Sequence, residues 1–131
     1  MAAPEQVLEN PVCGERVTFE SVSDDELVML VALRTGGARG PAHRQPAQEE
    51  RYEVLSGAIV AEVGDAPAQT LRAGDVLAVA PGVRHRFTAT DDAEARITFR
   101  PALRWAAFVE RLFAGEDPAA LLREFSAEIR V

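Results

Sequence analysis

Apolar residues alternate with polar ones from about residue 16 to residue 100, in short runs that Gly, Pro and Asp residues separate. Alternation places every second side chain on one face of a strand, and turns at such close spacing are typical of an all-β sandwich or barrel. The continuously apolar run 27–33 predicts a strand that is buried on both faces. The predicted strands are 16–21, 27–33, 51–55, 58–63, 76–79, 86–90 and 96–100.

After Pro101 the apolar period lengthens from two to about 3.6 residues, which indicates helices. One helix is expected to end near Gly115, and the next begins where Asp117 can cap it and Pro118 takes its first position. The apolar faces are Trp105, Phe108, Val109 and Leu112 in the first helix, and Leu121, Leu122, Phe125 and Ile129 in the second. We therefore predict one domain over 1–131, with a barrel at about 16–100 and two short helices at 101–131 packed outside it.

Composition and charge exclude several classes of function. The formal net charge of −7 disfavours nucleic acid and anionic lipid as partners. Every basic residue is Arg, so a lysine Schiff base is impossible, and the single cysteine, Cys13, excludes an internal disulfide and is expected to be a packed small side chain. The sequence shows neither a signal peptide nor the roughly 20 apolar residues of a membrane span. We expect a cytoplasmic protein without a membrane partner.

The first stretch with candidate chemistry runs from residue 37 to residue 57. His43 and Gln45 are two residues apart, so they share a face if this segment is extended. In the following strand Glu50 shares a face with Tyr52 and Val54. A carboxylate among apolar neighbours is costly unless a cation or a metal ion compensates it. We therefore expect a positive partner for Glu50, with the neighbouring Glu49 as the alternative carboxylate for this role.

The second stretch places His85 directly after a Pro81-Gly82 turn and on the same strand face as Phe87. If that face is interior, His43, His85 and Glu50 converge in one cavity. Two imidazoles and one carboxylate suit Fe(II), and also Zn(II), Mn(II), Ni(II) or Co(II). Gln45 is either a weak fourth ligand or a hydrogen-bond partner of the ligands. Tyr52 and Phe87 are expected to form the cavity wall that binds substrate, and Arg84 and Arg86 to point away from it.

With these residues the sequence resembles the cupins, specifically small single-domain cupins of the bacterial standalone kind. The first cupin motif is matched in residue type and spacing by Gly37, His43, Glu50 and Gly57. The second motif is matched by Gly74, Gly82 and His85. The sequence departs from the motifs at Gln45, where a second histidine is usual, at Ala80, where a proline is usual, and at Ala89, where an asparagine is usual. The resemblance implies a double-stranded β-helix, or jelly roll, and one bound divalent metal ion.

The resemblance covers enzymes and binding proteins, so function classes stay open. The first hypothesis is a metal-dependent enzyme that acts on a small oxygen-rich or polyketide-like molecule such as an enol, a β-dicarbonyl or a phenol, as a dioxygenase or as a cyclase or isomerase. The alternative is a non-catalytic cupin that binds a small molecule without metal. A third interpretation is a dimeric scaffold, and we expect a homodimer in each case.

Overall fold

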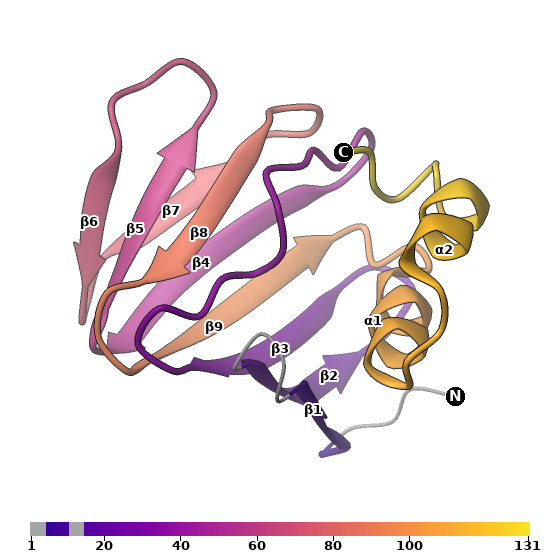
Figure 1. Cartoon of the computed structure of the whole chain (residues 1–131), viewed down its shortest axis with the longest axis horizontal. Helices are drawn as coiled ribbons and strands as arrows, with labels where there is room; N and C mark the ends of the chain where they lie inside the picture. The colour runs from indigo at the N-terminus through magenta and orange to yellow at the C-terminus, as the bar shows by residue number, and fades with distance from the viewer. Residues whose placement is uncertain (1–4, 11–14) are drawn as a thin grey trace.

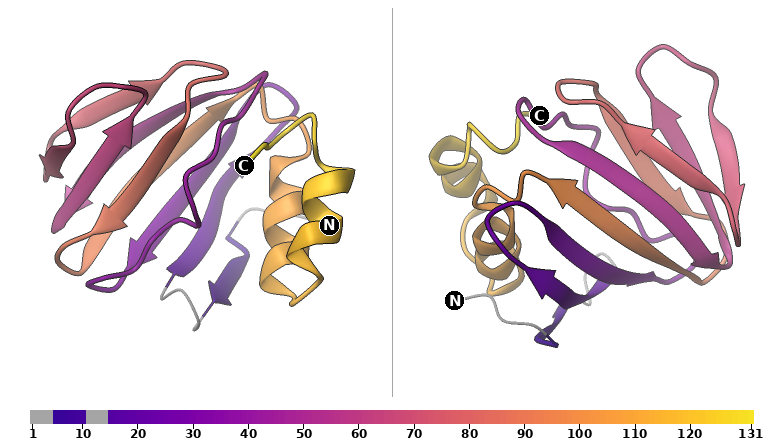
Figure 2. Two further views of the ribbon diagram at one scale, coloured as in Figure 1. Left: turned by 45° about the horizontal axis from the view of Figure 1, so that its top comes forward. Right: turned by 180° about the vertical axis from the view of Figure 1, so that it is seen from behind.

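The computed structural model describes residues 5–10 and 15–131, and antiparallel strands are its main regular structure (Figure 1). One sheet has six strands in the order β1-β2-β3-β9-β4-β7, and a second has three in the order β6-β5-β8. The two sheets lie opposite each other and form a flattened barrel (Figure 2). The strands are β1 (Val7–Asn10), β2 (Glu15–Val22), β3 (Leu27–Leu33), β4 (Glu49–Ser56), β5 (Ala58–Val63), β6 (Gln69–Arg72), β7 (Val76–Val79), β8 (His85–Ala89) and β9 (Ala93–Arg100).

The alternating pattern predicted the strands that carry the core. The pattern did not predict β1 and β6, which are four residues each and lie at the edges of their sheets, where packing constrains the sequence little. The prediction that 27–33 is buried on both faces is wrong. Leu27, Met29, Val31 and Leu33 are buried, whereas Val28, Leu30 and Ala32 are partly exposed, because only the inner face of β3 is fully covered. Cys13 lies outside the described residues.

The two C-terminal helices are α1 (Trp105–Phe113) and α2 (Pro118–Glu124), and they lie together at one side of the barrel (Figures 1 and 2). Asp117 caps α2 as predicted, since its side chain accepts a hydrogen bond from the Ala119 N–H. The prediction that Phe125 and Ile129 belong to the second helix is wrong, because α2 ends at Glu124; both side chains are nevertheless buried. Among the described residues, no helix has the length and apolar character needed to cross a membrane.

Turn geometry brings the two chemically interesting stretches together. Gly82 has a φ of +81°, a conformation that favours glycine, and its N–H donates to the Gln45 carbonyl at 2.8 Å. At the other end of β4, Gly57 leaves no room for a side chain, because an added Cβ would lie 2.1 Å from the Asp92 carbonyl oxygen. The barrel therefore needs Gly57 for close packing of its backbone and favours Gly82 for its positive φ, which directs the chain into β8.

Candidate metal centre

His43 and His85 are held beside each other by their own backbones. The His43 N–H donates to the His85 carbonyl at 3.0 Å, and the His85 N–H donates back to the His43 carbonyl at 2.8 Å. Two residues that exchange both hydrogen bonds point their side chains to the same side. Their rings lie 4.6 Å apart between centroids, and both residues are buried. The backbone pairing thus brings the two imidazole rings of the chain together.

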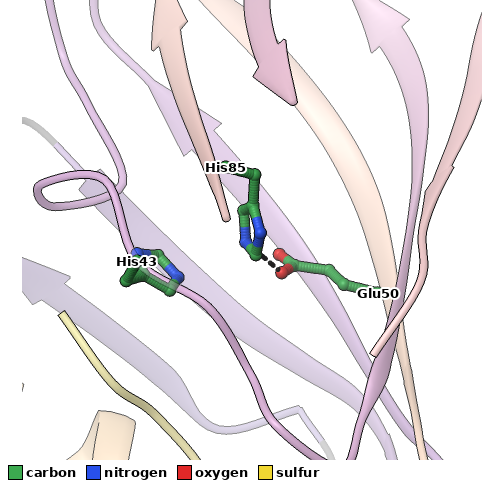
Figure 3. A group of neighbouring side chains, drawn as sticks. All are labelled: His43, Glu50 and His85. Atoms are coloured by element: carbon green, nitrogen blue, oxygen red, sulfur yellow. Dashed lines mark ion pairs between the residues drawn. The ribbon is translucent and has the colours of Figure 1, made fainter. Parts of the chain in front are cut away.

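Glu50 completes the group from the neighbouring strand β4. It is 1% exposed and pairs with Val79 on one side and Phe99 on the other. One ligand atom from each of His43, Glu50 and His85 lies within 4.8 Å of the others, as Figure 3 shows. Glu49 points outward and is exposed, so the carboxylate inside the barrel is the predicted one.

The ring nitrogens of both histidines have assigned roles. His43 Nδ1 lies 2.9 Å from the Pro41 carbonyl oxygen, and His85 Nδ1 lies 2.9 Å from the Val83 carbonyl oxygen. A carbonyl oxygen can only accept, so each Nδ1 carries the proton. In the neutral imidazoles Nε2 is then an unprotonated nitrogen with a free lone pair, which is the form that binds a metal ion.

This tautomer leaves acceptors facing one another. His85 Nε2 and Glu50 Oε2 are 3.0 Å apart, and among the described residues neither has a hydrogen-bond partner. Two buried acceptors at this distance need a positive charge between or on them, since unsatisfied buried polar atoms are costly. A proton on His85 or a metal ion meets the need. The donor set of two imidazoles and a carboxylate therefore fits a divalent ion.

A buried arginine also contacts the group. Arg39 Nη1 donates to Glu50 Oε1 at 3.0 Å and to the Tyr52 hydroxyl at 2.8 Å, and its Nε donates to Glu15 Oε2 at 2.6 Å. The side chains of Arg39 and Glu15 are 8% and 7% exposed. Glu50 thus offers one oxygen to Arg39 and keeps Oε2 for the histidines.

These contacts shift the pKa values in opposite directions. Burial lowers the pKa of His43 below its ordinary value of 6.5 and favours the neutral ligand. Burial acts the same way on His85, but the Glu50 carboxylate outweighs it and raises the pKa of His85. For Glu50, burial favours the neutral acid, but His85 and Arg39 together hold its pKa below 4.5. The carboxylate is ionised at neutral pH, as a metal ligand must be.

Gln45 is fixed by a second glutamine that sequence analysis did not single out. Gln48 Nε2 donates to the carbonyl oxygens of Pro101 and Ala102, at 2.8 and 2.9 Å, so Gln48 Oε1 must be its acceptor end. Gln45 Nε2 donates to that oxygen at 2.9 Å. Gln45 Oε1 is left buried and without a partner among the described residues. The amide therefore has a free oxygen to offer, which is the end that can bind a metal ion.

The predicted wall residues lie inside the barrel. Tyr52 and Phe87 are both 1% exposed and stack with ring centroids 3.7 Å apart. The pair lies next to the metal group, because the Tyr52 hydroxyl accepts from Arg39 and the Phe87 ring lies 5.7 Å from the His85 ring between centroids. Arg84 and Arg86 are exposed, as expected. A role for Tyr52 and Phe87 in binding substrate stays a prediction.

A cavity of about 310 Å³ opens beside His43, between the loop that carries Arg39 and the two helices. Trp105 lines it and lies nearly parallel to the His43 ring, at 6.4 Å between centroids. The apolar face of the first helix, which includes Trp105, was expected to pack against the outside of the barrel. In the structure, the same face also forms a wall of the candidate site.

The fold and the site together define a β-barrel protein with a buried group of two histidines and one carboxylate. The chain belongs to the cupin domain family, whose model matches residues 19–99. The family assignment and the double-stranded β-helix that it implied are therefore confirmed.

Among curated proteins, the chain is similar to Protein SchB of Streptomyces halstedii, at 41% identity over 71 residues. The match covers 54% of this chain and 51% of SchB, so the chain spans about half the length of that relative.

Two solved structures share the fold at low identity. KdgF from Halomonas sp. has a TM-score of 0.70 at 18% identity, over 78% of this chain and 94% of that one. An RmlC-like cupin from Shewanella frigidimarina has a TM-score of 0.69 at 21% identity, over 81% of this chain and 94% of that one.

Proposed function

We propose that the chain is a metal-dependent enzyme that acts on a small oxygen-rich or polyketide-like molecule. His43, Glu50 and His85 hold one divalent ion, with Gln45 Oε1 as a fourth, neutral ligand. The observation that carries this proposal is the pair of buried acceptors, His85 Nε2 and Glu50 Oε2, which lie 3.0 Å apart while both histidines are locked with Nδ1 as the donor. A metal ion bound by both atoms would satisfy both acceptors, and two imidazoles and a carboxylate are a donor set that suits it.

The bound ion supplies Lewis-acid polarisation of substrate oxygens or, as iron, oxygen activation. The protein residues do the rest. Arg39 holds Glu50 in place through Oε1, and the stacked Tyr52–Phe87 pair packs in the core of the barrel next to these residues. His43 reaches both the metal group and the cavity, so substrate approaches from the side of His43.

The cavity favours cyclisation or isomerisation over oxygenation as the reaction. Both of the former need a group that takes a proton from carbon or oxygen and returns it. Glu15 is the carboxylate among the residues that line the cavity, and it is buried beside Arg39. We propose that Glu15 carries this proton. Oxygenation is the second candidate, and activity with Zn(II) in the absence of oxygen distinguishes the two.

A non-catalytic, metal-free binding protein is favoured by one feature of the same site. Arg39 already offsets the charge of Glu50, and a protonated His85 would satisfy Glu50 Oε2 without any metal. The structure of such a protein would need no ion. Metal analysis decides between the two functions.

The experiment measures metal content and thermal stability. Protein is purified without added metal, and Fe(II), Zn(II), Ni(II) or Mn(II) is then added in turn. We expect one ion per chain and a rise in Tm with at least one of them, because an ion that binds only the folded state stabilises it. Affinity should weaken as the pH falls toward and below about 6.5, since both histidines must lose their proton to bind.

Glu50→Gln and Glu49→Gln make a matched pair for this experiment, because the residues are neighbours and only Glu50 is buried. Glu50→Gln and His43→Gln should each lose the ion, while Glu49→Gln keeps it. Circular dichroism checks that the variants fold. If no ion raises the Tm of the wild type, or if Glu50→Gln binds metal as the wild type does, the metal-dependent enzyme is excluded.

We also propose that the chain is a cytoplasmic homodimer with a small-molecule ligand as its other partner. Several apolar side chains are exposed, including Val7 on the edge strand β1 and Val76 on the edge strand β7. Edge strands with exposed apolar residues are common sites of association. Sedimentation that finds only a species of 14.2 kDa would contradict the dimer.

A further inference from the structure

The cavity beside His43 has two chemically different ends. Its polar lining comes from the barrel, through Glu15 at the start of β2 and through Arg39 and His43 in the loop before β4. Apart from Gly40 and Pro41 of the same loop, the rest of its lining is apolar and comes from α1, α2 and the C-terminal residues. These apolar residues are Trp105, Phe108, Val109, Leu112, Phe113, Pro118, Leu122, Ile129 and Val131.

The metal group and the cavity share one residue. Glu50, His85, Tyr52 and Phe87 do not line the cavity, whereas His43 does. A molecule that reaches the metal group from the side of His43 would therefore extend toward the helices and not deeper into the barrel. The volume of about 310 Å³ is at the lower end of the range for small-molecule sites.

The charges around the polar end favour an anionic oxygen. Glu15 and Glu50 carry two negative charges and Arg39 one positive charge, all of them buried. A divalent ion added to this set would leave one positive charge in excess. Buried charge is stable only when it is balanced, so a ligand with a single ionised oxygen fits this end.

An unsatisfied donor lies in the apolar wall. Trp105 Nε1 is buried and has no hydrogen-bond partner among the described residues. A buried indole N–H usually has an acceptor. A second oxygen on the ligand, admitted by a small shift of the Trp105 ring, would supply one.

We infer that the C-terminal helices form a selectivity chamber for an aromatic or similarly apolar body joined to an ionisable oxygen head, as in an aryl β-dicarbonyl or a phenol. The head faces His43 and Arg39, and the body packs on α1 and α2. This inference rests on the proposed function for the position of the head. The chamber itself depends only on the cavity lining, so the chamber and the proposed metal-dependent function can each be wrong without the other.

Two probes that differ by one ring test the chamber. Acetylacetone offers the β-dicarbonyl head alone, and benzoylacetone adds a phenyl group. Titration calorimetry on the Zn(II)-loaded wild type should give benzoylacetone an affinity about tenfold or more above that of acetylacetone, because the phenyl group leaves water for the apolar wall. Equal affinities for the two probes would overturn the inference.

Variants that fill the chamber locate the effect. Leu112 in α1 and Leu122 in α2 both line the cavity and are only partly buried, so Leu112→Trp and Leu122→Trp can be accommodated. Each should reduce the affinity for benzoylacetone to near that of acetylacetone and leave metal content unchanged. Leu55→Trp is the control, because Leu55 is exposed on β4 and does not line the cavity. A loss of benzoylacetone binding that is equal in all three variants would contradict a chamber at the helices.

The same titrations on metal-free protein separate this inference from the proposed function. If no metal binds but the wild type still prefers benzoylacetone and Leu112→Trp abolishes the preference, the chamber stands and the metal-dependent enzyme falls. If metal binds at one ion per chain and the preference is missing, the proposed function stands and the chamber falls.

Discussion

Arg39 and Arg111 each bind two carboxylates, yet they do so in opposite surroundings. Arg39 pairs with Glu15 and Glu50 inside the barrel, where the three side chains are at most 8% exposed. Arg111 on α1 pairs with Glu116 and Glu124 at the surface of the helices, where the three side chains are 37–48% exposed. Residue types and stoichiometry are the same, so burial is the variable that differs.

The comparison shows that the number of ion pairs says little about their contribution. Water and salt screen the Arg111 cluster, so the loss of a member changes little. Around Arg39 the side chains are at most 8% exposed, so water compensates a lost partner poorly and an orphaned charge stays largely buried. The two clusters also differ in their relation to the candidate site, because the buried cluster contains the candidate metal ligand Glu50 and the exposed cluster contains no candidate ligand.

The largest expected effect is that of Arg39→Met in the metal-free protein. The substitution keeps an unbranched side chain but leaves Glu15 and Glu50 buried without their cation, which costs about 3–5 kcal/mol of unfolding free energy. Urea unfolding at neutral pH measures it. Arg111→Met is the matched control and should unfold close to the wild-type midpoint.

A double variant sharpens the interpretation. Arg39→Met combined with Glu50→Gln removes both members of one pair, so it should be more stable than Arg39→Met alone. If the two substitutions add up without recovery, burial of an unpaired charge is not what makes Arg39 important.

Gln48→Met tests whether burial matters without charge. Gln48 is 1% exposed, and its loss leaves the Pro101 and Ala102 carbonyls and the Gln45 amide group without their partner. We expect a loss of about 1–3 kcal/mol in urea unfolding, smaller than that of Arg39→Met. A cost as large as that of Arg39→Met would show that buried charge adds nothing to the effect of burial.

Arg104→Gln gives a case between the two clusters. Arg104 is half exposed, but its partner Glu128 is 3% exposed and accepts from Arg104 Nη2 at 2.8 Å. One partner can regain water and the other cannot, so the shift in unfolding midpoint should fall between those of Arg39→Met and Arg111→Met. A midpoint outside that interval would contradict the expectation that the cost of losing an ion pair increases with the burial of its members.

The smallest effect is the dependence of the Arg111 cluster on pH and salt. Arg111 holds the pKa of Glu116 and of Glu124 below the ordinary 4.5. Lowered carboxyl pKa values stabilise the folded state above about pH 4.5, and the gain is lost as the pH falls through the lowered values. The Tm difference between wild type and Arg111→Gln should be slight at neutral pH and vanish in acid. In 1 M salt, where the Debye length is about 3 Å, it should shrink further.

The contrast also explains what sequence could and could not predict. His43, Glu50 and His85 were found because strand alternation and the two motif spacings constrain them. Arg39 lies in a loop without a period, and nothing in its neighbours marks it as buried. A signal was nevertheless available, since the expectation that Glu50 needs a positive partner pointed to an arginine in a chain without lysine.

The helices were predicted from their apolar period, but their second role was not. A helix face that packs on a core and a face that lines a cavity have the same sequence pattern, because both are apolar. Gln48, like Arg39, lies in the segment before β4 that has no regular period, so the sequence pattern did not mark it. Its importance comes from contacts with Pro101 and Ala102, which are far from it in the sequence.

The chain has one tryptophan and one tyrosine, and both lie at the candidate site. Trp105 lies beside His43, and the Tyr52 hydroxyl shares Arg39 with Glu50. The intrinsic fluorescence of the unlabelled protein therefore reports on this one place rather than on the fold as a whole. An ion that quenches indole emission, such as Ni(II), or a ligand that packs against the ring can be followed optically, without any label and in the native chain.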